Sequence, residues 1–246
     1  SALAGDLESR LVGHRALVGR LLAALLTGGH VLVEGAPGLA KTRAVKQLSG
    51  RIEASFSRIQ CTPDLMPADL TGTPVWRPDR GAFEFVPGPV FHALVLVDEI
   101  NRAPPKVQSA LLEAMAESQV TAGGTTHPLG EPFMVVATQN PIEHEGTFPL
   151  PEAQLDRFLF HVRVGLPDAA GERAILDLVE AEADDAEAGA SGQGAVPPVR
   201  LPASLIAVAK REVRAVHLAP ALKDYIVRLV TATRTEEAGR EVREAI

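Results

Sequence analysis

The chain has 246 residues, enough to bury a full core and a smaller second one, and its 46% apolar and 22% charged residues are typical of a globular protein. The net charge of −7 argues against a protein that binds nucleic acid mainly by neutralising phosphates, and the single cysteine, Cys61, excludes an intramolecular disulfide and a multi-cysteine zinc site. The sequence has no apolar run near the roughly 18 residues of a membrane span and begins without the pattern of a secretory signal, so we expect a cytoplasmic protein.

In chain order, the apolar patterns predict a helix over 13–26, a short buried strand at 30–34, a helix over 41–48, a buried strand at 93–99, a helix from Pro104 and a buried strand at 133–140. Strands that alternate with helices indicate a parallel sheet with helices on both faces. We therefore predict the α/β fold class, with a large domain over 1–167.

Two insertions interrupt this alternation. Residues 61–92 are rich in Pro, Gly and Phe, and Phe83 and Phe85 alternate there as on a strand that packs one face into a core. Residues 119–132 hold a Gly-Gly pair between β-prone segments, which predicts a hairpin.

The composition changes after Pro167. A helix is predicted over 171–183, and the acidic, small-residue stretch 184–198 is interpreted as a flexible loop. Two more helices follow near 202–215 and 219–234, with no further strand. We predict a small helical second domain over 168–246.

The segment GAPGLAKT, from Gly35 to Thr42, follows the first strand and differs from the phosphate loop G-x-x-x-x-G-K-[ST] by Ala40. A Cβ there is tolerable where φ is negative. Backbone N–H groups beside a helix N-terminus form an anion site, Lys41 would reach the β- and γ-phosphates of a nucleotide, and Thr42 would ligate Mg²⁺. The loop around the phosphates comprises Gly35, Ala36, Pro37, Gly38, Leu39 and Ala40. The alternative is an ordinary strand–turn–helix.

Polar residues also end the two later strands. Asp98 would hold Mg²⁺ through water, and Glu99 would orient and deprotonate an attacking water, or both are helix-capping acids. Asn140 either positions water beside the γ-phosphate or forms an Asx turn before a proline. Arg157 either stabilises the γ-phosphate of a neighbouring subunit or is a surface arginine paired with an adjacent acid.

Taken together, these elements resemble the MoxR family of AAA+ ATPases. The resemblance covers nearly all of residues 10–167 and is carried by GHVLVEGAPGLAKT, RIQCTPDLMPADLTGT, LVLVDEINRAPPKVQSALLEAMAE and ATQNPIEHEGTFPLPEAQLDRF. GLAKT is a familiar form of the loop in that family, so the resemblance implies a working loop despite Ala40.

The resemblance implies roles for individual residues. Lys41 with Thr42 corresponds to Walker A, Asp98 with Glu99 to Walker B, Asn140 to sensor 1 and Arg157 to an arginine finger acting in trans. The adenine-pocket segment corresponds to Val12, Gly13 and His14. The two insertions resemble the helix-2 insert and the pre-sensor hairpin.

The family also implies an assembly. We expect a hexameric ring, with ATP held between the large domain and the helical lid, and a protein client, often one with a von Willebrand factor A domain. The sequence ends in GREVREAI without the family's Ser-Pro-Arg-like segment, so we nominate no sensor 2 residue and expect an incomplete lid.

Three functions follow as hypotheses. The leading one is an Mg²⁺-dependent ATPase that remodels or matures a partner protein. The alternative is a nucleotide-gated binding module with little turnover. The third is a nucleic-acid motor, against which stand the negative charge and a 119–132 hairpin without Lys or Arg.

Overall fold

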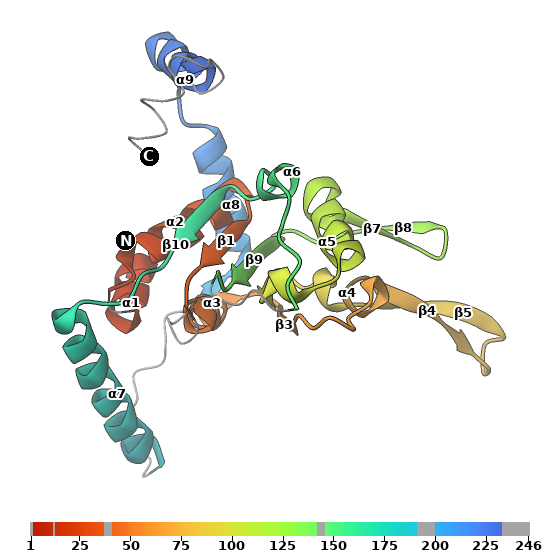
Figure 1. Cartoon of the computed structure of the whole chain (residues 1–246), viewed down its shortest axis with the longest axis horizontal. Coiled ribbons are helices and arrows are strands. Elements are labelled where there is room, and N and C mark those ends of the chain that lie inside the picture. Colours follow the sequence, from red (N-terminus) through yellow and green to blue (C-terminus); the bar gives the residue numbers. More distant parts are fainter. Residues whose placement is uncertain (1, 12, 37–40, 142–145, 191–199, 233–246) are drawn as a thin grey trace. The chain divides into compact units, whose positions relative to one another are not determined.

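The computed structural model describes residues 2–11, 13–36, 41–141, 146–190 (side chains as far as Ala181) and 200–232 (Figure 1). At its centre is a five-stranded sheet in which every neighbouring pair of strands is parallel. The strand order is β10 (Phe160–Arg163), β1 (Val31–Glu34), β9 (Met134–Gln139), β6 (Leu94–Asp98) and β3 (Phe56–Gln60). This confirms the predicted α/β class.

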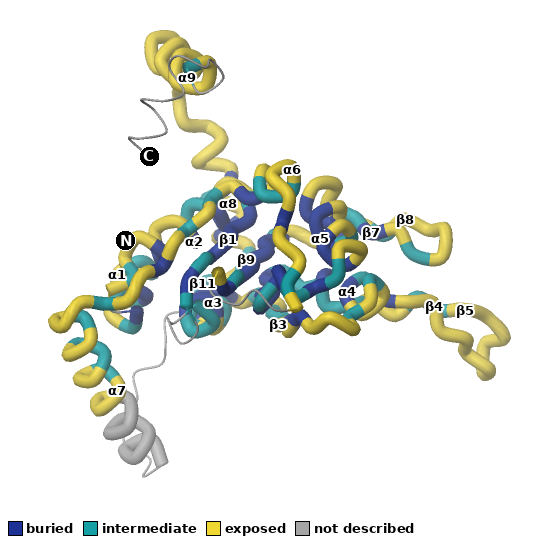
Figure 2. Tube along the Cα trace, in the orientation of Figure 1, coloured by how far each residue is buried: buried dark blue, intermediate teal, exposed yellow. Residues whose placement is uncertain are grey.

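The inner strands are buried on both faces, which is why their sequences are continuous apolar runs. Successive strand residues point to opposite faces. On β6, Val95 and Val97 join one buried cluster and Leu94 and Leu96 join the other. Figure 2 shows the dark, buried trace along β1 and β9 inside an exposed periphery.

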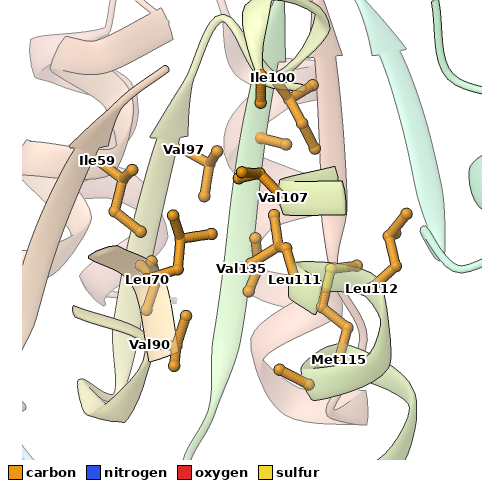
Figure 3. Packing of buried hydrophobic residues seen from close by; sticks show 14 of the residues in the cluster. Ile59, Leu70, Val90, Val97, Ile100, Val107, Leu111, Leu112, Met115 and Val135 are labelled. Atoms are coloured by element: carbon orange, nitrogen blue, oxygen red, sulfur yellow. The ribbon is translucent and has the colours of Figure 1, made fainter. Parts of the chain in front are cut away.

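Helices cover both faces. The cluster of Leu94 and Leu96 packs against α1 (Ala2–Arg10), α2 (Arg15–Thr27) and α3 (Lys41–Ser49). The cluster of Val95 and Val97 packs against α4 (Pro67–Thr71), the short helix η1 (Pro89–Phe91) and α5 (Pro105–Glu117). Figure 3 shows this second cluster, where apolar side chains of α4 and α5 meet those of the strands.

Both insertions contain antiparallel hairpins: β4 (Gly72–Arg77) with β5 (Ala82–Pro87), and β7 (Gln119–Ala122) with β8 (Thr125–Pro128). The predicted hairpin in 119–132 is confirmed. Phe85 stacks on His127 of the other hairpin, with ring centroids 3.8 Å apart and planes at 11°. The predicted core position of Phe83 is wrong: it is 70% exposed and packs edge-on against Trp76, whereas Phe85, two residues further along the same face of β5, is half-buried.

Beyond the sheet, α7 (Ala169–Ala190) corrects the loop predicted from residue 184. Three of the seven residues of 184–190 are alanine, whose high helix propensity favours continuation of the helix. The prediction of no further strand is also wrong, since β11 (Leu201–Pro202) pairs with β2 (Ile52–Glu53).

The last described helices are α8 (Ala203–Arg214) and α9 (Pro220–Ala232). By internal contacts the chain forms two compact units, Ser1–Lys210 and Arg211–Ile246. The functional boundary at 167 stays a prediction. Of the described helices, none is both long enough and apolar enough to cross a membrane.

Candidate functional site

The carboxyl ends of three adjacent strands bring the predicted site residues to one edge of the sheet. β1, β9 and β6 are neighbours and run parallel, so the segments that follow them emerge on the same side. In open α/β sheets this edge is where ligands bind. It carries Lys41 and Thr42 at the start of α3, Asp98 and Glu99 after β6, and Asn140 after β9.

Lys41 and Thr42 occupy the first turn of α3. The ammonium of Lys41 donates hydrogen bonds to the carbonyls of Gly35 and, at 3.3 Å, of Gln139. The hydroxyl of Thr42 lies 3.3 Å from Asp98 Oδ1 and 3.5 Å from Oδ2. A hydroxyl beside a carboxylate is the oxygen-rich donor set that Mg²⁺ prefers, so these two residues fit that ion.

Asp98 is a buried carboxylate with several donors around it. Its side chain is 7% exposed. Oδ1 accepts the hydroxyl proton of Thr138 at 3.2 Å, and Oδ2 accepts Nε–H of Arg58 at 2.6 Å. Because a buried carboxylate requires such partners, these contacts compensate for its burial and hold the Asp98 side chain in a fixed orientation.

Glu99 has a strained backbone, with φ 58° and ψ 51° in the left-handed region that non-glycine residues rarely adopt. Strain of this kind is concentrated at functional sites. Its N–H donates to the Thr138 hydroxyl at 3.0 Å. Its Oε2 accepts hydrogen bonds from Gln60 at 3.0 Å and from Arg102, in the short helix η2 (Ile100–Arg102), at 3.1 Å.

Asn140 is 4% exposed at the end of β9, and its carbonyl accepts a hydrogen bond from Asn101 at 3.3 Å. A cavity of about 240 Å³ lies beside it. The cavity is lined by Asn101, Gln139, Asn140, Pro141, Thr147, Pro149, Leu150 and Leu155. The carboxyl end of β9, where Asn140 lies, is therefore accessible to a small group.

Arg157 lies two residues beyond the short helix α6 (Glu152–Leu155), and it is exposed. Within the described part of the chain it forms no ion pair, so the predicted alternative of a partner at Asp156 or Glu152 is not found. Arg157 does not join the other site residues through any described contact.

The adenine-pocket segment is described in part. His14 precedes α2, is half-buried, and has its pKa lowered by burial, which favours a neutral ring. Gly13 has φ 78° and is exposed. Gly35 is buried and Ala36 half-buried, while Val12, Pro37, Gly38, Leu39 and Ala40 lie outside the described residues.

Three residues of the site were not predicted: Arg58 and Gln60 on β3, and Thr138 on β9. Arg58 and Gln60 are two apart on one strand and therefore share a face, and Gln60 pairs in register with Asp98. Two polar side chains at the carboxyl end of a strand were the available signal. It was missed because β3 itself was not predicted.

Cys61 is buried beside the site. Burial, together with the charges of Asp98 and Glu99, raises the pKa of its thiol to about 12. Its N–H donates to the carbonyl of Asp98 at 2.9 Å, which extends the pairing of β3 with β6.

Comparisons with known proteins bear on the family of the chain and on its fold. The sequence model of the "ATPase family associated with various cellular activities (AAA)" matches residues 30–160. A crystal structure of a candidate ATPase from Cytophaga hutchinsonii is similar, with a TM-score of 0.79 and 42% identity, over 94% of this chain and 68% of that one.

Relatives of known name are similar over nearly the whole chain. Chaperone MoxR1 of Mycobacterium tuberculosis is 47% identical over 94% of this chain and 59% of its own length. The uncharacterized protein YeaC of Bacillus subtilis is 48% identical over 91% and 67%, and protein MoxR of Paracoccus denitrificans is 32% identical over 93% and 67%. The chain thus spans about 59% to 67% of the length of these relatives. From the matched family and these identities, the chain belongs to the MoxR family of AAA+ ATPases.

Proposed function

We propose that the protein hydrolyses ATP in a Mg²⁺-dependent reaction. One observation supports this above the others: Thr42 and Asp98, 56 positions apart in the sequence, lie with hydroxyl and carboxylate 3.3 Å apart, and Glu99 follows directly. A metal-holding pair beside a second carboxylate is what phosphoryl transfer to water requires.

In this proposal Lys41 binds the β- and γ-phosphates at the N-terminus of α3, where helix dipole and ammonium both favour an anion. Its present acceptors, the carbonyls of Gly35 and Gln139, hold the ammonium at the carboxyl ends of β1 and β9. Thr42 and, through water, Asp98 would hold Mg²⁺, which when bound neutralises charge on the phosphate oxygens.

Glu99 orients a water for in-line attack and accepts its proton, as the water oxygen bonds to the γ-phosphorus and the bond to the leaving ADP oxygen breaks. The products are ADP and phosphate. Asn140, a neutral amide, positions the water without adding negative charge. Arg157 of an adjacent subunit would stabilise the charge that develops on the γ-phosphoryl group.

We further propose that hydrolysis drives chaperone-like remodelling or maturation of a protein client, in a hexameric ring with the helical 168–246 segment as part of the lid. A partner with a von Willebrand factor A domain is the expected client class. Support comes from the name of the 47% identical Chaperone MoxR1 and from the exposed Arg157. Against a nucleic-acid motor, Arg77 and Arg80 of the β4–β5 hairpin are both paired with Glu84.

The test is ATP turnover by the protein and by its Glu99→Gln variant. We expect turnover to fall by about 10²-fold or more, as for loss of a general base, with ATP binding retained. Glu113→Gln, an exposed change on α5, is the matched control and should match the wild type. Equal turnover for Glu99→Gln and the wild type contradicts the mechanism. Tight ATP binding without turnover in the wild type supports the nucleotide-gated binding module instead.

A further inference from the structure

Arg58 and Asp98 form an ion pair whose two side chains differ in their exposure to solvent. The two side chains meet at 2.6 Å, but Asp98 is 7% exposed and Arg58 is 46% exposed. Asp98 ends an inner strand, whereas Arg58 projects from β3, the last strand of the sheet order. The carboxylate is therefore fixed, and the guanidinium is able to swing into solvent.

The oxygens of Asp98 have different partners. Oδ1 accepts the hydroxyl of Thr138 at 3.2 Å, and Thr42 lies 3.3 Å from the same oxygen. Arg58 donates to Oδ2. In the proposed function this carboxylate and Thr42 hold Mg²⁺, so the guanidinium opposes the ion twice: it uses a carboxylate oxygen, and it places positive charge beside a divalent cation.

Arg58 is also connected to Glu99. Its Nη2 donates to Gln60 Oε1 at 3.3 Å, and the amide of Gln60 donates to Glu99 Oε2 at 3.0 Å. The side-chain amide of Gln60 thus links the Arg58 guanidinium, which is bonded to Asp98, to the carboxylate of Glu99. Movement of Arg58 away from Asp98 removes one of the contacts that fix Gln60.

We propose that Arg58 is a positioning residue that competes with Mg²⁺ for Asp98, so that metal binding requires its guanidinium to leave and the Gln60–Glu99 contact to loosen. Arg58 then sets the Mg²⁺ concentration at which nucleotide binds. This inference rests on the proposed Mg²⁺–ATP site. It differs from a purely supporting role for Arg58, in which its removal would weaken metal binding.

The experiment titrates Mg²⁺ into protein mixed with a fluorescent, non-hydrolysable ATP analogue and records the Mg²⁺ concentration at half-maximal binding. For Arg58→Gln we expect this half-point to fall about three- to tenfold, because one opposing charge is removed from a partly screened pair. Arg77→Gln is the matched control: Arg77 is also 46% exposed and also paired with a carboxylate, that of Glu84 at 3.0 Å. Its half-point should equal the wild-type value.

A second readout uses Mg²⁺ alone, without nucleotide. Thermal unfolding of Arg58→Gln should shift upward with Mg²⁺ more than that of the wild type, since Asp98 has lost its cation. If Arg58→Gln does not fold, Arg58→Lys, which keeps the charge but loses the planar donors, should lower the half-point by a smaller factor.

The outcomes separate the two proposals. A half-point for Arg58→Gln that is unchanged or higher, with normal Mg²⁺-dependent binding by the wild type, overturns the competition and leaves the proposed function standing. A wild type that binds the analogue with no dependence on Mg²⁺ overturns both.

Discussion

Thr138 donates its hydroxyl proton to Asp98 Oδ1 at 3.2 Å while it accepts the N–H of Glu99 at 3.0 Å. One buried hydroxyl on β9 thus fixes both consecutive carboxylate residues at the end of β6. A hydroxyl has one donor and two acceptor positions, so the arrangement uses its donor and one of its acceptor positions. The left-handed backbone at Glu99 is held in place by this bond.

Thr138→Val should therefore damage both stability and turnover. The near-isosteric change leaves a partly buried N–H and a buried carboxylate each short of one partner, which costs about 1–3 kcal/mol in the free energy of unfolding. ATP hydrolysis should fall because Glu99 is no longer oriented. Denaturant unfolding and steady-state turnover measure the two effects. Thr138→Ser keeps the hydroxyl and should restore most of both, and wild-type behaviour of Thr138→Val would contradict the role.

His30 should make stability dependent on pH. Its Nδ1 accepts the N–H of Val135 at 3.0 Å, and Nε2 lies 3.3 Å from the Met115 carbonyl, so the neutral ring carries its proton on Nε2. Burial lowers the pKa of His30, although the bond to Met115 opposes this shift. The unfolded state therefore binds the proton more readily, and the stabilisation is present above the ordinary pKa and lost as the pH falls below it.

We expect the free energy of unfolding to decrease as the pH falls below about 6.5, the ordinary histidine pKa. Denaturant unfolding at a series of pH values measures this. His30→Asn, which retains an acceptor but does not titrate, should be less stable at neutral pH and show a flatter dependence. His217→Asn, at an exposed position, is the control. If the free energy of unfolding had the same slope against pH in His30→Asn and in the wild type, His30 would be excluded as a source of the pH dependence.

The sequence predicted the inner strands well because they are buried on both faces. β1, β6 and β9 are continuous apolar runs, and each was predicted within a residue or so of its bounds. The flanking β3 and β10 were missed. Phe56–Gln60 and Phe160–Arg163 are mixed polar and apolar segments at the two ends of the sheet order of the described strands, so their pairing depends on the rest of the sheet.

The site shows the same division. Lys41, Thr42, Asp98 and Glu99 were predicted from local motifs. Strand pairing, not a local motif, brings Arg58, Gln60 and Thr138 to the site. For example, the parallel pairing of β3 with β6 places Gln60 opposite Asp98. Such contacts between distant segments follow from tertiary packing and have no signature in a single short stretch of sequence.

Gly72 at the base of the β4–β5 hairpin should not tolerate a side chain. Its φ is +90°, and a Cβ there would overlap the carbonyl oxygen of Val86 and lie 2.6 Å from the N of Gly88. Gly72→Ala should lower the free energy of unfolding by about 2–4 kcal/mol, from backbone strain plus overlap with rigid backbone. Gly81→Ala shares a positive φ, +60°, but meets open space, so it should cost about 1 kcal/mol. Thermal unfolding of the two variants compares them, and equal losses would show that overlap plays no part.

Arg157 should act across a subunit boundary. It follows α6 at an exposed position, and the buried Phe158 beside it fixes the backbone while leaving the guanidinium outward. Arg157→Ala should leave ATP binding nearly unchanged and lower hydrolysis by about 10³-fold, the effect typical of an arginine finger. Arg173→Ala, an exposed change on α7, is the control.

The decisive measurement mixes Arg157→Ala with Lys41→Ala, each inactive alone. In a ring assembled at random from equal amounts, about a quarter of the interfaces join an intact Lys41 to an intact Arg157, so hydrolysis should recover to about that fraction of wild type. Complete absence of recovery, with subunit exchange verified by size measurement, would place Arg157 outside the neighbouring site.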